Sequence, residues 1–221
     1  VKDAKQKKII SIVFLFSFTL HILAVLVIFY GSFQPFSDGR GDFIQYHFTA
    51  VETTQRLSQG NFSIKGLALA HYFPLIVGYL YFLLIPKMII GQLLNAWLVS
   101  LTVVFAYLIV KEFGRTNKEA FIVALIINLY PSLAFFGSLM LKESFVVFFS
   151  TLSLLLALKL INTFSWKIFT LFYISLMGLA HFRFFTILPL IFVFVLLWFI
   201  FYKFQFKRKV LYCLAMLFLF G

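Results

Sequence analysis

Two acidic residues that lie far apart in the chain, Asp42 and Glu143, are the side chains best suited to acid–base chemistry. Lys142 directly precedes Glu143, and Arg183 follows at the end of a later apolar run. A carboxylate can deprotonate a hydroxyl acceptor, and a nearby cation can neutralise a departing phosphate. Glycosyl transfer from a lipid phosphate needs both. We therefore predict that Asp42 and Glu143 are catalytic and that Arg183 and Lys142 contact the donor phosphate.

The stretch around Asp42 is the longest one that is neither strongly apolar nor terminal, and it holds further polar candidates. Asp38, Tyr46, His47 and His71 lie within it, and we predict them as substrate-loop residues. A divalent metal ion could bind between the acids and the loop histidines, with the two predicted catalytic carboxylates as its ligands. The sequence has no His/Cys cluster with zinc spacing and no phosphate-cradling glycine loop. The cofactor is therefore left open.

Each of these residues also has a purely structural explanation. Asp42 followed by Gln45 resembles a capping box, which predicts a helix that starts near residue 43. Asp38 in Ser-Asp-Gly-Arg-Gly is typical of a turn, and Glu143 would be stabilised by the positive end of a helix dipole. Arg183 would extend toward lipid headgroups, and the loop histidines would be structural or interfacial. The sequence leaves these alternatives open.

An extreme composition decides which elements position these residues. The 221 residues are 63% hydrophobic, 21% aromatic and only 12% charged. Soluble domains average about 45–50% apolar and about 25% charged residues, so this much apolar surface needs lipid as its solvent. The apolar runs are continuous, whereas a membrane β-barrel alternates. We therefore predict an all-α integral membrane protein.

The formal charge of +12 does not indicate nucleic acid as a partner. The basic residues form short clusters between apolar runs, a pattern that sets membrane topology and attracts anionic lipid. Cys213 is the single cysteine, so the sequence offers no intrachain disulfide. The lipid bilayer is the partner that the composition predicts.

We predict a polytopic helical bundle of about seven spans, forming one transmembrane domain over residues 1–221. A span needs about 20 apolar residues, and the first run is too long for a secretory signal. The seventh run stops at Gly221, so we expect the last span to be incomplete and the chain to be the N-terminal part of a longer protein. The predicted spans are Ile9–Tyr30, Gly91–Val110, Ala120–Phe136, Phe145–Leu158, Trp166–Ala180, Phe184–Tyr202 and a start at Val210.

Charge indicates which segments are external. If the short apolar piece from Pro74 to Ile85 does not cross, 13 basic residues lie inside and six outside, as the positive-inside tendency favours. We therefore predict a cytoplasmic N-terminus and an external first loop, residues 32–90, that carries juxtamembrane helices. The six external basic residues would be Arg40, Arg56, Lys65, Lys87, Lys142 and Arg183.

Two helices are expected in this external loop. One starts near Phe43 and ends at 58–61, and its mildly apolar face predicts that it lies along the membrane interface. The residues of that face are Phe43, Tyr46, Ala50, Thr53 and Leu57. The second is the piece from Pro74 to Ile85, which contains Gly78 and is expected to be re-entrant or interfacial.

Several motifs, taken in their order, resemble those of the polytopic GT-C glycosyltransferases. The nearest likeness is to the protein O-mannosyltransferase and aminoarabinose-transferase-like members and their bacterial relatives, over about residues 9–189. No single motif is specific, but their order and spacing are. The segments that carry the resemblance are Gly41–His47, His71–Pro74, Gly91–Ala96, Tyr107–Arg115, Leu129–Ser132, Leu141–Glu143 and Gly178–Arg183.

The resemblance implies an inverting transfer of a sugar from a polyprenyl-phosphate donor to an external lipid, glycan or protein acceptor. It implies Asp42 as the catalytic base, Glu143 as the acid of the second external loop and Arg183 as a donor-phosphate contact. The chain departs from the family pattern in two places. Phe43 follows Asp42 where members often have a second acid, and Lys142 precedes Glu143.

Two other functions compete with transfer. A transporter or flippase for lipid-linked glycans would place charges and broken helices deep within its spans, whereas here the acids lie at span ends. A non-enzymatic assembly subunit is the third hypothesis. The abundance of Phe, Ile and Lys favours a bacterial inner membrane as the location.

Overall fold

The computed structural model describes residues 2–31, 41–63, 65–67 and 72–201. Every regular element in this part of the chain is an α-helix, as the composition predicts. The helices are α1 (Lys2–Tyr30), α2 (Asp42–Ser58), α3 (Phe73–Leu83), α4 (Met88–Glu112), α5 (Asn117–Asn128), α6 (Pro131–Gly137), α7 (Glu143–Asn162) and α8 (Trp166–Phe201).

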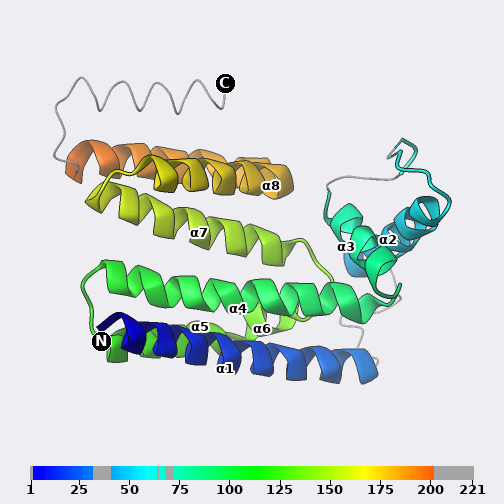
Figure 1. Cartoon of the computed structure of the whole chain (residues 1–221), viewed down its shortest axis with the longest axis horizontal. Helices are drawn as coiled ribbons and strands as arrows, with labels where there is room; N and C mark the ends of the chain where they lie inside the picture. The colour runs from blue at the N-terminus through cyan, green and yellow to red at the C-terminus, as the bar shows by residue number, and fades with distance from the viewer. Residues whose placement is uncertain (1, 32–40, 64, 68–71, 202–221) are drawn as a thin grey trace.

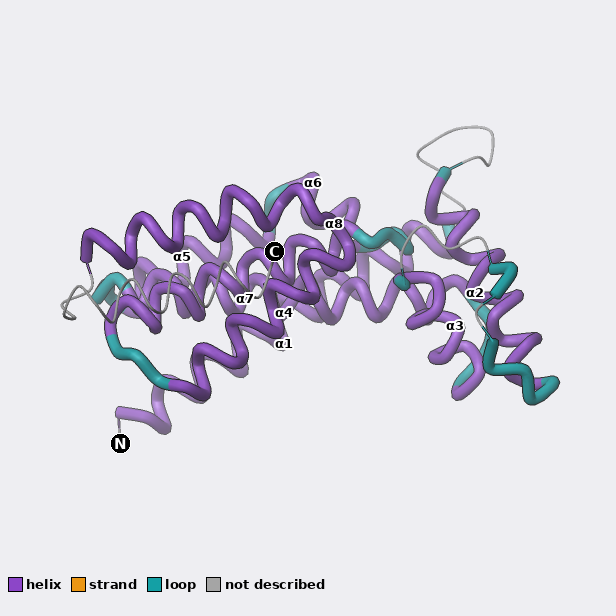
Figure 2. Tube along the Cα trace, turned by 90° about the horizontal axis from the view of Figure 1, so that it is seen from above, coloured by secondary structure: helices purple, strands orange, loops and turns teal. Residues whose placement is uncertain are grey.

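The long helices form a bundle, and α2 and α3 pack together at one end of it (Figure 1). Helix α4 packs against α1, α5 and α7, and α7 packs in turn against α8. The second view shows the same arrangement, with α2 and α3 beyond the end of the bundle (Figure 2). We call α2 and α3 the arm, and the end of the bundle that carries them the arm end.

Four helices are long and apolar enough to cross a membrane. They correspond to residues 6–30, 88–112, 143–162 and 166–196, and a fifth span exists if the bent pair α5 and α6 is one span. The prediction of an all-helical fold with helices long and apolar enough to cross a membrane is therefore confirmed. The count of seven spans stays a prediction, and its last member, from Val210, lies outside the described residues.

Helix α8 folds back on itself at Arg183. That residue has non-helical backbone angles, φ −159° and ψ 84°. The rings of Phe172 and Phe194 lie 4.6 Å apart, whereas 22 residues of straight helix would separate them by roughly 33 Å. The two halves of α8 therefore run antiparallel (Figure 1). Their bounds are near those of the two predicted segments 166–180 and 184–202. The turn at Arg183 lies at the arm end.

The predicted span from Ala120 to Phe136 consists of two helices with a bend between them, and it stays a prediction that the pair crosses a membrane. Helix α5 stops at Asn128 and α6 starts at Pro131, with a 60° bend between them. Proline is favoured at the first position of a helix, where its missing N–H removes no bond, but within one it would break a hydrogen bond. Pro131 therefore starts a new helix in a new direction.

The position of α2 along the membrane interface stays a prediction, but its apolar face is not available to lipid. Its residues Phe43, Tyr46, Ala50, Thr53 and Leu57 are all buried within the protein. They are covered because α3 packs on this face with a close approach at Gly78. A Cβ added there would lie 2.6 Å from that of Thr53 and 3.0 Å from the carbonyl oxygen of Ala50.

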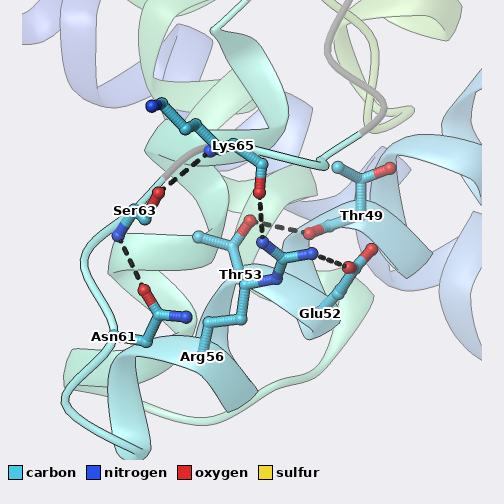
Figure 3. Close-up of polar contacts among 7 residues, drawn as sticks. All are labelled: Thr49, Glu52, Thr53, Arg56, Asn61, Ser63 and Lys65. Carbon is cyan, nitrogen blue, oxygen red and sulfur yellow. Dashed lines mark hydrogen bonds and ion pairs between the residues drawn. The ribbon is translucent and has the colours of Figure 1, made fainter.

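The far end of α2 is closed by a group of polar contacts (Figure 3). The Arg56 guanidinium donates to Glu52 Oε1 at 2.7 Å and to the Lys65 carbonyl at 2.7 Å. The backbone N–H of Ser63 donates to Asn61 Oδ1 at 3.0 Å. Gly60 has a φ of +73°, so the helix ends at the predicted place. Glu52, the remaining acid of the first loop's described part, is thus in an ion pair.

Candidate functional site

Asp42 is the first residue of α2, and its side chain does not cap that helix. The N-cap is Gly41, in an extended conformation, and no side chain there bonds to the backbone. The predicted capping box with Gln45 is therefore wrong, because the helix starts one residue earlier than such a box requires. The Asp42 carboxylate instead accepts a long hydrogen bond, 3.4 Å, from the Tyr46 hydroxyl. It is exposed to solvent.

Glu143 is the first residue of α7 and likewise makes no capping hydrogen bond. The turn that precedes Glu143 is hydrogen-bonded to Asn95 of α4. The Asn95 side-chain amide donates to the carbonyl oxygens of Leu139 at 2.6 Å and Leu141 at 2.7 Å. Gly91 lets Met140 pack directly on α4, since an added Cβ would meet its side chain at 2.6 Å. The position of Glu143 is thus fixed by α4.

These two carboxylates line the same cavity. It has a volume of about 340 Å³ and is bounded by Gly41, Asp42, Phe136, Leu141 and Glu143. Ligand pockets commonly measure about 300–1,000 Å³, so a sugar-sized molecule would fit. In the described part of the chain, the ion pairs are Arg56–Glu52 and Lys159–Glu112. Neither cavity acid therefore forms an ion pair with a basic residue in the described part of the chain.

The Tyr46 hydroxyl responds to both acids. Burial is the main cause that raises its pKa, and the charges of Asp42 and Glu143 raise it further. The phenol therefore stays protonated over the physiological range and can donate to Asp42. The influence of both acids on one phenol agrees with their position around the same cavity.

A series of aromatic ring contacts joins the arm to the bundle. The ring of Tyr46 lies 5.5 Å from that of Phe73, which lies 5.6 Å from Phe145. Phe145 in turn lies 4.7 Å from Phe182. These contacts link α2, α3, α7 and α8, and each ring is within four residues of a predicted site residue. Edge-to-face aromatic pairs stabilise a fold beyond the burial of their apolar area. These ring contacts therefore fix the positions of the neighbouring polar residues relative to one another.

The two predicted phosphate contacts lie at the arm end but are not among the residues that bound the cavity. Lys142 is partly buried as the N-cap of α7. Arg183 is exposed at the turn of α8, next to His181, whose ring stacks on Tyr72 at 4.0 Å and 2°. In the part of the chain that the structure describes, neither cation has an ion pair. Both could reach an anionic group that enters from that end.

His47 has a hydrogen bond within the arm. Its Nδ1 lies 2.9 Å from the Tyr81 hydroxyl, which donates to Met140 Sδ at 3.4 Å. Burial lowers the pKa of His47, so the neutral ring is favoured. This chain connects α2 and α3 to the turn before Glu143. His47 therefore has a positioning contact instead of a free face toward the cavity acids.

The remaining predicted site residues are not placed. Asp38 and His71 lie outside the described residues. Within the described ranges, no group of three or more His, Cys, Asp or Glu side chains could hold a metal ion. Asp42 and Glu143 would supply two carboxylates, and a magnesium ion bound in this way takes its remaining ligands from water and substrate phosphate.

Sequence reasoning missed the residues that position the two acids. Asn95 and Tyr81 act through the turn before Glu143, and Phe136 forms a wall of the cavity. A signal for Asn95 was present, because an amide within an apolar span is costly unless it is hydrogen-bonded. For Tyr81 and Phe136 no signal existed, since both are ordinary in an aromatic-rich chain.

Comparisons with known proteins supply no family for this chain. The GT-C likeness of its motifs therefore remains an expectation from the residues alone. No protein-family model, no curated protein and no solved structure matches the sequence or the fold.

Proposed function

We propose that this protein is a membrane glycosyltransferase. It would move a sugar from a polyprenyl-phosphate-linked donor to a lipid, glycan or protein acceptor outside a bacterial inner membrane. The observation that carries the proposal is the pairing of Asp42 and Glu143 in one cavity at the end of an apolar bundle. Neither acid caps its helix or pairs with a described cation, so both are available for chemistry.

The proposed reaction is a single displacement. The acceptor oxygen forms a bond to the anomeric carbon while the bond from that carbon to the phosphate oxygen breaks. The electron pair leaves with the phosphate, and the acceptor proton passes to Asp42. Glu143 would orient the acceptor or stabilise positive charge on the sugar, and attack from the face opposite the phosphate inverts the anomeric centre.

The surroundings of the cavity support a lipid-linked donor. A polyprenyl chain would lie along the apolar bundle, which places its phosphate at the arm end. Lys142 and Arg183 are there and lack described ion pairs. A site next to hydrocarbon strengthens each charge contact to a departing phosphate. The same geometry puts the N-terminus of α1 at the opposite end, the cytoplasmic one in this proposal.

The test is donor cleavage in membranes that contain the full chain. Polyprenyl-phosphate hexoses and pentoses would be supplied one at a time, and released polyprenyl phosphate would be measured. Asp42→Asn should remove the release, because an amide cannot accept the proton. Glu52→Gln is the matched control on the same helix, since Glu52 pairs with Arg56 away from the cavity. Normal release by Asp42→Asn, or none by the wild type with any donor, would overturn the proposal.

We also consider a second function, the movement of a lipid-linked glycan across the membrane. The support for it comes from the region where α5 and α6 meet α1. Helices α5 and α6 form a broken segment. Near the break, the Ser17 hydroxyl donates to Asn128 Oδ1 at 2.7 Å, and His21 is fully buried beside Asn128. Buried polar groups beside a broken helix are typical of transport pathways. Vesicles that contain a lipid-linked sugar with a dithionite-sensitive fluorophore would separate the functions, because dithionite outside the vesicles bleaches only molecules in the outer leaflet. If the protein is a transporter, His21→Leu should abolish transbilayer movement of the labelled lipid, and Asp42→Asn should leave that movement unchanged.

A further inference from the structure

Four consecutive apolar residues at the end of α3 are exposed. Phe82, Leu83, Leu84 and Ile85 have exposed fractions of 46%, 72%, 62% and 46%. We call these four residues the α3 tip. A run of exposed apolar residues of this kind marks a binding surface. The rest of α3 has no charged side chain either.

The exposure of the tip does not come from loose packing of α3. On the opposite side of the same helix, Phe73, Val77 and Tyr81 are almost completely buried. Gly78 allows the backbones of α3 and α2 to approach closely. The helix is therefore held firmly on one side, and this fixes the direction in which the tip projects.

The start of α4 determines what covers the tip. The backbone N–H of Lys87 donates to the Ile85 carbonyl at 2.8 Å, and α4 begins at Met88. Three residues extend at most about 10 Å, so the tip lies at the level where this membrane-grade helix begins. Lys87 can extend its ammonium to headgroups, and Tyr79 is half-exposed on α3, as expected at an interface. The apolar surface of the tip thus continues that of α4.

The other helix of the arm has the opposite character. The exposed side of α2 carries Asp42, Gln45, Glu52 and Gln55, and its apolar face is covered by α3. One aromatic residue, Phe48, interrupts this polar side. The arm therefore presents a mainly polar surface through α2 and an apolar one through α3. A second copy of this chain would have to match both surfaces, whereas a bilayer boundary provides water and hydrocarbon side by side.

We propose that the α3 tip inserts into the outer part of the bilayer and anchors the arm to the membrane. Its ligands are the upper acyl chains of the leaflet, with Lys87 at the phosphate level. The arm is then fixed at two points, the aromatic contacts to the bundle and the lipid contact of the tip. This inference rests on the exposure and position of α3 and is independent of the reaction proposed above.

The experiment is spin-label accessibility in lipid vesicles. In a Cys213→Ser background, a nitroxide would be attached to Leu83→Cys, Phe62→Cys or Val27→Cys. These three positions have matched exposed fractions of 72%, 71% and 69%. Phe62 lies in the loop after α2, and Val27 lies near the arm end of α1. Oxygen concentrates in hydrocarbon and a nickel chelate in water, so the ratio of their collision rates reports the surroundings.

We expect the label at Leu83 to collide more with oxygen than with nickel, as at Val27, and the label at Phe62 to show the reverse. Each labelled protein must first elute like the wild type, which exposed cysteines should allow. A nickel-dominated ratio at Leu83 would overturn the proposal. So would protection from both reagents with broadening of the spectrum by a second spin, because that result would identify another copy of the chain as the cover.

Discussion

At each end of the bundle an acidic residue stands in the first turn of a helix, but the surroundings of these acids differ. At the end opposite the arm, Glu119 of α5 forms a capping box with Thr116. The Thr116 N–H donates to Glu119 Oε2 at 2.8 Å, and the Glu119 N–H donates to Thr116 Oγ1 at 3.2 Å. At the arm end, Asp42 and Glu143 make no such bonds and line a cavity instead.

The difference shows that an acid at a helix start has two separable uses. Glu119 satisfies backbone groups that would otherwise lack partners. At the arm end the helix starts rely on other residues, Gly41 and Lys142, and the acids keep their oxygens free of backbone bonds. The two carboxylates at the arm end therefore differ from Glu119 in that they line a cavity and have no ion pair among the described residues.

The largest expected effect separates the two ends by activity. Glu143→Gln should lower the rate of donor cleavage by about 100-fold, the usual effect of losing a group that stabilises charge in the transition state. Glu119→Gln should leave the rate within about twofold, because an amide oxygen can still accept from Thr116 in the same box. Initial rates in membranes matched for protein content would decide. Equal losses in both variants would remove the distinction between the ends.

The next effect concerns packing. Gly78→Ala would place a Cβ 2.6 Å from that of Thr53, and such overpacking costs about 1–3 kcal/mol. The arm should loosen and carry Asp42 away from the cavity, which limited proteolysis of α2 would detect. Gly114→Ala is the partner variant at the opposite end. Gly114 has a φ of +73°, and an added Cβ would contact no other atom within 4 Å. The substitution should therefore strain the backbone at the end of α4 and leave α2 protected from proteolysis.

A smaller effect concerns the helix starts themselves. Thr116→Ala should lower the free energy of unfolding by about 1 kcal/mol, as is typical for a lost N-cap. Gln45→Ala should change it by less than about 0.5 kcal/mol, as at an ordinary surface position, because Gln45 does not form the capping box that its sequence suggests. Thermal unfolding in detergent would compare them. A larger loss for Gln45→Ala would contradict the description of the start of α2.

The smallest effect is a dependence on pH. Burial lowers the pKa of His47 below its ordinary value, so the unfolded arm binds a proton before the folded arm does. The stability of the arm should therefore be constant above about pH 6.5 and fall as the pH drops below that value. Hydrogen exchange of α2 at pH 7.5 and 5.5 would measure it, with the same measurement on His47→Gln as the reference. His47→Gln should flatten the response of α2.

Much of the fold could be predicted because lipid is a demanding solvent. Backbone groups in hydrocarbon must bond within their own segment, so long apolar runs become helices. The segments 9–30, 91–110 and 145–158 each lie within one observed helix. The break after Asn128 was missed, because apolar composition continues through it and only Pro131 indicates a new start. The face of α2 was misassigned, since its pattern does not reveal whether lipid or α3 covers it.

Composition and local chemistry are enough to predict the helical, apolar class of the protein, the positions of most helices and the two candidate acids. The tertiary structure decided which acids share a space. Asp42 and Glu143 come to one cavity through the turn of Leu139–Leu141 on Asn95 and through the packing of α2 on α3. Such long-range contacts depend on shape complementarity between buried surfaces, which no local pattern encodes.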